Sequence, residues 1–269
     1  MVDSLKLLAV FPHPDDETLG MGSTLARYAA EGVDVYLVCA TRGERGWFDS
    51  EGPNPGLAGL ARIRERELRC AAEQLGIHEV DFLDYIDGDV DQADPEEIIG
   101  ELVAHIRRIQ PQVVVTFAPD GAYGHPDHIA LSQFTHGALV CAADRNFDDP
   151  NAQPPHRVSK FYYMVDSLDV VNVVKETLGG ISMDVDGVTR HHIGWEDWQI
   201  TTRLDNTQYV DKVQKATLCH KSQLPGYKPL IEGSAVGLMR IFGTGHFYRV
   251  FSFVNGGRKV ELDLFEGLR

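Results

Sequence analysis

The fold is decided near the amino terminus, where residues 5–17 read LKLLAVFPHPDDE. The apolar run LKLLAVF (5–11) is typical of a strand that is buried on both faces of a sheet. A polar turn follows, and a helical stretch near 20–31 leads to a second apolar run, VDVYLVCA (33–40). This order of strand, helix and strand predicts a parallel βαβ unit.

The same alternation continues through the first half of the chain. The pattern predicts a helix at 57–75, a strand at 79–84, a helix at 95–109 capped by Asp94-Pro95, a strand at 112–118 and a helix starting near His125. Repeated βα units with short connections indicate a Rossmann-like α/β fold, with a mostly parallel sheet and helices on both of its faces.

The second half is less regular and is expected to form a β-rich portion that completes the pocket. The elements predicted there are a strand at 160–165, a helix around 205–222 and strands at 247–254 and 259–265. Residues 166–204 follow no clear period, and we expect a β-rich excursion or a lid. Because no linker separates the halves, we predict a single domain over 1–269, with a Rossmann-like core at about 5–145 and the pocket-completing part at about 157–269.

Charge narrows the classes of partner. The 269 residues include 25 Lys+Arg and 40 Asp+Glu, which gives a net charge of −15. This balance argues against nucleic-acid binding and against docking on an anionic membrane surface. The start of the chain does not read as a signal peptide, and no segment approaches the roughly 18 apolar residues of a membrane helix. A soluble cytoplasmic protein is therefore expected.

Cysteine usage points the same way. The four cysteines are far apart in the sequence and form no CxxC pair: Cys39, Cys70, Cys141 and Cys219. Each lies in an apolar or helical stretch, which predicts small buried side chains rather than a disulfide framework.

Two turns of similar composition follow predicted strands. His13-Pro14-Asp15-Asp16-Glu17 follows the strand at 5–11, and His125-Pro126-Asp127-His128 follows the strand at 112–118. Ligands of an open parallel sheet bind beyond the carboxyl ends of its strands, so these turns are expected to meet. One such turn alone is usually a helix cap. Two of them favour a metal site with nitrogen and oxygen ligands, such as the three-ligand site of a catalytic zinc.

These paired motifs resemble the LmbE-like, or PIG-L, family of zinc-dependent N-deacetylases, whose members act on N-acetylglucosaminyl conjugates. The likeness covers roughly residues 5–225. The other positions that support it are Thr41-Arg42-Gly43-Glu44, Arg64, Glu67, Asp87 and His220-Lys221-Ser222-Gln223. One departure is Pro12, where the family usually has a small residue. The resemblance implies a hydrolase that holds one Zn²⁺ per chain and removes the acetyl group from an N-acetylglucosamine-containing small molecule.

By motif position, the resemblance implies that His13, Asp16 and His128 bind zinc and that Asp15 is the general base. Zinc would activate the attacking water, and Asp15 would accept its proton. The proton for the leaving amine would come from Asp15 or from His125, and the sequence leaves that choice open.

The remaining roles implied by the resemblance concern the oxyanion and the sugar. His125 would stabilise the oxyanion, with Asp127 orienting it and favouring its imidazolium, and Tyr123 would add a hydroxyl group. Arg64 and Asp87 would contact the sugar or the aglycone. Two residues have less defined roles: Glu17 is a helix cap or a support of the metal ligands, and His220 is a neighbour of the site or a structural histidine. The resemblance also implies a possible homo-oligomer, with the late strands as its surface.

Other functions are also compatible with parts of the pattern. Gly20-x-Gly22 suggests a dinucleotide fingerprint, but Leu25 replaces the third glycine and carboxylates occupy the phosphate position. An amidase that cleaves a larger acyl group, as in mycothiol-conjugate hydrolysis, is an alternative that the loop at 42–60 and residues 166–204 would decide. A non-catalytic metal-binding module is the weaker alternative, because a structural zinc has four protein ligands.

Overall fold

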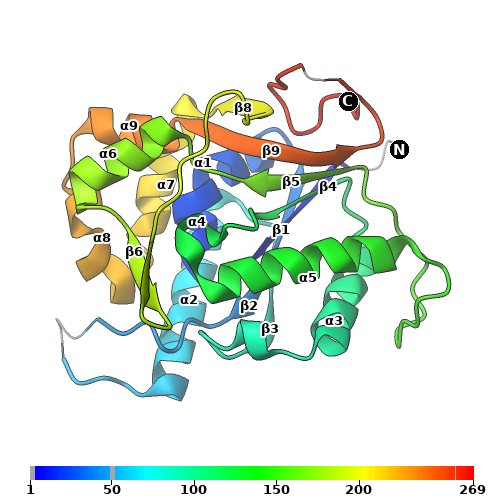
Figure 1. The fold of residues 1–269 in the computed structure, drawn as a ribbon, viewed down its shortest axis with the longest axis horizontal. Coiled ribbons are helices and arrows are strands. Elements are labelled where there is room, and N and C mark those ends of the chain that lie inside the picture. The colour runs from blue at the N-terminus through cyan, green and yellow to red at the C-terminus, as the bar shows by residue number, and fades with distance from the viewer. Residues whose placement is uncertain (1–3, 49–51, 258) are drawn as a thin grey trace.

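A seven-stranded sheet runs through the computed structural model, which describes residues 4–48, 52–257 and 259–269 (Figure 1). Its order is β3-β2-β1-β4-β5-β9-β8. The strands are β1 (Lys6–Phe11), β2 (Asp34–Thr41), β3 (Glu79–Tyr85), β4 (Val113–Phe117), β5 (Lys160–Met164), β8 (Thr202–Asp205) and β9 (Thr244–Ser252). The first five are parallel, while β9 pairs antiparallel with β5, and β8 pairs antiparallel with β9. The predicted fold class is confirmed.

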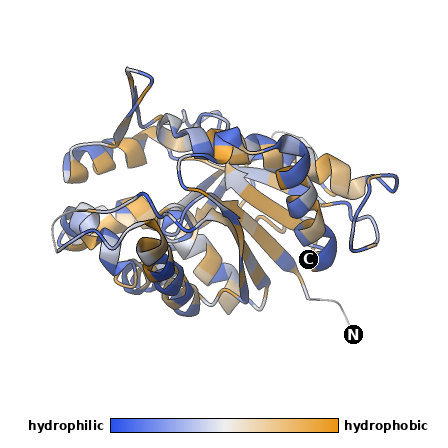
Figure 2. Ribbon diagram, turned by 90° about the horizontal axis from the view of Figure 1, so that it is seen from below, coloured by the Kyte–Doolittle hydropathy of each residue, from blue (hydrophilic) through white to orange (hydrophobic). Residues whose placement is uncertain are grey.

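Helices cover both faces of the sheet because the inner strands are apolar on both sides. Leu7 and Phe11 of β1 pack into a core with α1 (Asp16–Ala30), α2 (Leu57–Leu75) and α7 (Val210–Thr217). Leu8 and Val10 point the other way, into a core with α3 (Pro95–Ile109) and α5 (Pro126–Ala143). Figure 2 shows hydrophobic strands between helices of mixed hydropathy. The apolar run at 5–11 is continuous because β1 is buried on both faces of the sheet.

The strand order reverses between β1 and β4, which are neighbours although two βα units separate them in the sequence. β2 and β3 lie on one side of β1, and β4 and β5 on the other. The connections that leave the carboxyl ends of β1 and β4 diverge here, and ligands of such sheets bind at this switch point. The topology therefore brings the two histidine-containing turns to one place.

Residues 166–204 contain more helix than the sequence suggested. They form α6 (Leu168–Leu178), the hairpin of β6 (Ser182–Val185) and β7 (Val188–His191), and the start of β8. The single helix expected around 205–222 is instead α7 flanked by two 3₁₀ turns, Thr207–Tyr209 and Lys221–Gln223. The sequence also missed two short helices, α8 (Leu224–Ile231) and α9 (Ala235–Phe242).

The strand predicted at 259–265 is wrong. Only an isolated bridge between Thr202 and Glu261 occurs in the described part of this segment. The alternation is inverted, because Glu261 is 1% exposed while Val260 and Leu262 face solvent. Lys160 and Arg249 each lie within 2.8 Å of the Glu261 carboxylate and draw it inward, so the segment is held by a buried ion pair rather than by a strand ladder.

The prediction of unbonded cysteines is also wrong for one pair. Cys70 of α2 and Cys219, which follows α7, form a disulfide across 149 positions of the sequence. Their partnership depends on the packing of α2 against α7, which no local pattern reveals. Cys39 and Cys141 are free.

Reduction of this disulfide is expected to lower the melting temperature by roughly 10 °C, because a loop of this length corresponds to about 5 kcal/mol in the chain-entropy model. Melting curves with and without dithiothreitol measure the effect. Cys70→Ser should mimic reduction, whereas Cys141→Ser, the matched control, should retain the response to dithiothreitol. An unchanged melting temperature after complete reduction contradicts the prediction.

None of the helices in the described ranges combines the length and the apolar composition that a bilayer-spanning segment needs.

Candidate metal site

The first turn places a carboxylate in a conformation that helix capping does not require. Asp15 precedes α1 with φ 115° and ψ −26°, a left-handed conformation that is unfavourable for a residue with a side chain. Its side chain makes no capping hydrogen bond to α1. Backbone strain of this kind is characteristic of functional sites, and the capping interpretation does not hold for Asp15.

The second turn is formed by α4 (Gly121–Gly124), in which Ala122 has φ 63°. His125 follows as the N-cap of α5, and its Nδ1 accepts a hydrogen bond from the Asp127 backbone N–H at 3.2 Å. Pro126 occupies the first helical position, where its missing N–H has no cost. This cap fixes the ring orientation of His125 and leaves Nε2 free to carry its proton.

Three candidate ligand side chains converge between the two turns. Nε2 of His128 lies 3.3 Å from Nδ1 of His13, and carboxylate oxygens of Asp16 lie 3.5 Å from His13 Nδ1 and 3.7 Å from His128 Nε2. In a tetrahedral zinc site with bonds of about 2.0–2.1 Å, neighbouring ligand atoms are roughly 3.3 Å apart. His13, Asp16 and His128 therefore have nearly the mutual spacing of three zinc ligands.

Carboxylates behind His13 prepare it for this arrangement. Its Nε2–H faces Asp127 Oδ2 at 3.0 Å and Asp87 Oδ1 at 3.1 Å, which leaves Nδ1 directed at Asp16 and His128. Asp127 also accepts hydrogen bonds from the backbone of Gly88, at 2.7 Å. A ligand histidine commonly donates its second N–H to a carboxylate in this way.

The structure therefore corrects the predicted partner of Asp127. Its carboxylate orients His13 and not His125, because the Asp127 side chain extends from the start of α5 towards the turn that follows β1, where it bonds the His13 ring. The surroundings of His125 disfavour the imidazolium that was predicted for it. Burial, reinforced by the positive charge of His13, lowers the pKa of His125 to about 4, so its ring is neutral near pH 7.

The other two histidines differ in their response to burial. Burial disfavours the charged form of His13, but hydrogen bonds to Asp127, Asp16 and Asp87 outweigh it and raise its pKa well above the ordinary value. Burial lowers the pKa of His128 well below the ordinary value. The carboxylates around His13 thus distinguish it from His128, for which no carboxylate offsets the effect of burial.

Tyr123 forms the wall beside these rings. Its ring centroid lies 5.3 Å from that of His128 and 5.8 Å from that of His125, in edge-to-face arrangements. Burial and the surrounding carboxylates raise the pKa of Tyr123 far above the ordinary value, so its hydroxyl remains protonated.

Asp15 is held by two donors on a single oxygen. Arg64 Nη2 lies 2.8 Å and the Tyr227 hydroxyl 2.6 Å from Asp15 Oδ2. Burial raises the pKa of Asp15 above the ordinary value, against the opposing charge of Arg64. The sequence did not single out Tyr227, because it lies 212 positions from Asp15 on the unpredicted helix α8.

Arg64 is committed to the protein interior. Its guanidinium is 3% exposed and donates to the carbonyls of Gly43 and Pro14 as well as to Asp15. Gly43 has φ 63°, and the guanidinium fills the space that a Cβ would occupy there. Within the Thr41-Arg42-Gly43-Glu44 stretch, Gly43 is thus the residue that accommodates Arg64.

The late His220-Lys221-Ser222-Gln223 stretch supports the same turn. His220 Nε2 lies 3.0 Å from Glu17, whose other oxygen accepts the Asp15 backbone N–H at 2.9 Å. Ser222 donates to Glu67 of α2 through both its backbone N–H and its hydroxyl, at 2.8 and 2.7 Å. Glu17 thus links His220 to the backbone of Asp15, and its predicted support of the metal ligands stays a prediction.

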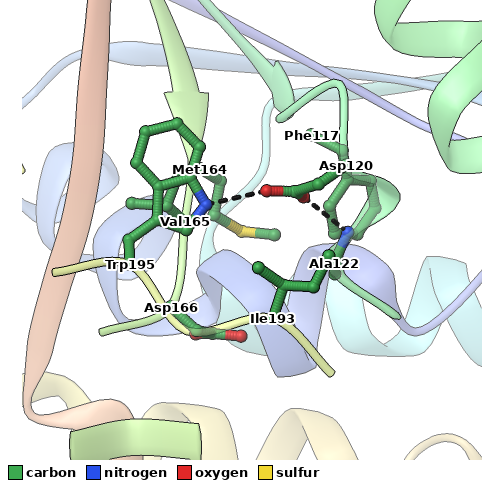
Figure 3. A pocket seen from close by; sticks show the side chains of 8 residues that line it. All are labelled: Phe117, Asp120, Ala122, Met164, Val165, Asp166, Ile193 and Trp195. Carbon is green, nitrogen blue, oxygen red and sulfur yellow. Dashed lines mark hydrogen bonds between the residues drawn. The ribbon is translucent and has the colours of Figure 1, made fainter. Parts of the chain in front are cut away.

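Residues 166–204 brace the second turn from outside. Trp195 Nε1 donates to Asp120 at 2.8 Å, and Asp120 accepts the Ala122 N–H at 2.9 Å (Figure 3). The Ile193 N–H donates to the Ala122 carbonyl, and Arg190 to that of Gly124. The cavity enclosed by these side chains has a volume of about 10 Å³, enough for about one water and too small for a sugar.

Fold and site together define a doubly wound α/β protein with a buried histidine–carboxylate cluster at its topological switch point. The model of the PIG-L family, described as GlcNAc-PI de-N-acetylase, matches residues 8–139. A 1D-myo-inositol 2-acetamido-2-deoxy-alpha-D-glucopyranoside deacetylase of Kineococcus radiotolerans is 33% identical, covering 98% of this chain and 83% of the relative. The chain belongs to the PIG-L family of N-deacetylases, which are hydrolases.

Solved structures share the fold at lower identity. The N,N'-diacetylchitobiose deacetylase of Pyrococcus horikoshii has a TM-score of 0.68 at 23% identity, covering 92% of this chain and 84% of that one. A 4-carboxy-2-hydroxymuconate hydratase of Pseudomonas putida has a TM-score of 0.65 at 21% identity, covering 94% and 99%. Since proteins with such different names share it, the fold alone does not define the reaction.

Proposed function

We propose that the protein is a zinc-dependent hydrolase that removes the acetyl group from an N-acetylglucosamine-containing small molecule. The observation that carries this proposal is the spacing of 3.3, 3.5 and 3.7 Å among ligand atoms of His13, Asp16 and His128, with Asp15 beside them. Two nitrogen ligands and one carboxylate suit Zn²⁺ and leave a fourth position for water or substrate. The donor set therefore fits one zinc ion per chain.

Zinc, when bound, would lower the pKa of a water molecule to about 7 and polarise the amide carbonyl. Asp15 accepts the proton of the attacking water. The Asp127 backbone N–H bonds Nδ1 of His125, so that Nε2 carries the proton of this ring. The Nε2–H of His125 donates to the oxyanion that develops on the carbonyl. The Tyr123 hydroxyl is the second donor to this oxyanion. A neutral His125 is a poor acid near pH 7, which favours Asp15 as the source of the proton for the leaving amine.

Of the two residues that the resemblance implied as sugar contacts, Arg64 and Asp87, we retain only Asp87. Arg64 is enclosed and bonded to Asp15, so we place it behind the general base rather than on the sugar. Asp87 is 9% exposed and remains the proposed contact for a sugar hydroxyl. Burial of so many carboxylates around one centre disfavours an anionic group near the scissile amide.

The inositol glycoside is the first substrate to test, because a relative that aligns over 98% of the chain is named for it. The experiment is a screen of free N-acetylglucosamine, its inositol and malate glycosides, N,N'-diacetylchitobiose and an acyl glycopeptide, with amine release as the readout. Stoichiometric acetate from one of the acetylated sugars supports the proposal. Amine release only from substrates with a larger acyl group selects the amidase alternative, and none from any substrate overturns both.

A further inference from the structure

Two donors share one carboxylate oxygen of Asp15. Arg64 and Tyr227 both bond Oδ2, at 2.8 and 2.6 Å. Across the described ranges, Oδ1 of Asp15 accepts no hydrogen bond. An ionised carboxylate oxygen has two lone pairs in its plane, so two donors saturate Oδ2. They also fix the plane of the carboxylate, because each bond to a charged acceptor is short and strong.

The phenol of Tyr227 is placed by contacts on both sides of α8. Before the helix, Ser222 is bound to Glu67, and the Gln223 side chain donates to the Gly46 carbonyl at 2.8 Å. Within the helix, the backbone of Gly226 lies against the Phe48 ring, so closely that a Cβ there would come within 3.0 Å of Cζ. The segment that positions Tyr227 beside Asp15 is thus held in place by its contacts with α2 and with the loop that follows β2.

We propose that Tyr227 is a positioning residue of the reaction, which together with Arg64 occupies Oδ2 of Asp15 so that Oδ1 receives the proton of the attacking water. The inference rests on the proposed role of Asp15 as general base. In the step, an O–H bond of water breaks, the Oδ1–H bond forms, and the water oxygen bonds to the carbonyl carbon while the π bond of the C=O group breaks and its electron pair moves to the carbonyl oxygen. Tyr227 keeps its own proton throughout.

Through Tyr227, the His220-Lys221-Ser222-Gln223 stretch supports the general base as a unit. Its serine and glutamine secure the start of α8, and the phenol four residues beyond Gln223 reaches the general base. A tyrosine that merely filled space would not need its hydroxyl, which is the atom that contacts Asp15.

The test is Tyr227→Phe, assayed on the substrate identified by the screen. We expect kcat to fall about 10- to 100-fold, as for other residues that orient catalytic groups, with KM changed less than about threefold. Zinc content, measured by mass spectrometry, should stay at the wild-type level. Tyr248→Phe, a tyrosine of β9 outside the site, is the matched control and should match the wild type. The comparison is made at a temperature where all variants retain the wild-type circular dichroism spectrum.

A wild-type kcat in Tyr227→Phe overturns the inference, and so does a rise in KM alone, which would make Tyr227 a substrate contact. Asp15→Asn, assayed in parallel, separates the role of Tyr227 from that of Asp15. If Asp15→Asn is inactive and Tyr227→Phe is fully active, only the role of Tyr227 fails. If Asp15→Asn retains wild-type turnover, the proposed mechanism fails and this inference with it.

Discussion

Replacing Asp15 by asparagine is expected to lower kcat about 10³-fold or more, because general base catalysis contributes about 10²- to 10⁴-fold and the amide cannot accept the proton. Asparagine preserves the size of the side chain and can still accept a hydrogen bond from Arg64 or Tyr227. Zinc content should therefore change little, since Asp15 is not among the three clustered ligand side chains. Rates of amine release and zinc content of the purified variant measure the two effects.

The matched control is Asp34→Asn, at the amino end of β2 and thus at the opposite edge of the sheet from the site. It should keep the wild-type rate. Turnover of Asp15→Asn within a few-fold of the wild type would exclude Asp15 as the general base. Loss of zinc from Asp15→Asn would instead indicate that Asp15 is itself a ligand.

His13→Ala is expected to lose both zinc and activity, with kcat/KM reduced at least about 10³-fold, since the metal supplies both activation of water and polarisation of the carbonyl. The variant removes one of the three clustered ligand side chains and leaves Asp127 and Asp87 without the ring that they bond. Zinc content, measured by mass spectrometry, is the direct readout, independent of the assay. Added zinc should restore activity to the chelator-treated wild type but not to His13→Ala.

His191→Ala, which removes an exposed histidine of β7, is the control for the general effect of losing an imidazole. It should bind one zinc per chain and retain activity. Stoichiometric zinc in His13→Ala would show that the ion is held elsewhere. Undiminished activity of the wild type after complete chelation would remove metal chemistry from the proposed function.

Local patterns predicted the first half of the fold well because each element there carries its own signals. Helix α2 (Leu57–Leu75) has the predicted bounds, since Gly76 ends it in a left-handed conformation at φ 79° that glycine adopts without strain. The side chain of Asp94 accepts hydrogen bonds at the start of α3, as the Asp94-Pro95 pair indicated. Such caps depend on neighbouring residues alone.

The features that were missed depend on residues far apart in the sequence. The Cys70–Cys219 disulfide requires α2 to pack on α7. The sequence of segment 259–265 has the pattern of a strand, but the ion pair with the distant Lys160 holds Glu261 in the interior. In the same way, the two metal-site turns could be paired by the topology of a parallel sheet, whereas the contact of Tyr227 with Asp15 required the position of α8. The mostly parallel sheet was inferable from general rules, but the placement of short helices after the sheet was not.

The left-handed backbone conformation of Asp15 lowers the stability of the fold at a position that the proposed reaction requires. A non-glycine residue held in such a conformation costs about 1–3 kcal/mol, which a glycine would largely avoid. Glycine would also remove the buried carboxylate, whose ionised form is costly in this environment. Selection for thermal stability alone would therefore favour the loss of Asp15, as expected where activity depends on a destabilising residue. Variants of this family that have exchanged this aspartate for glycine should be sought among proteins that have kept the fold and abandoned the reaction.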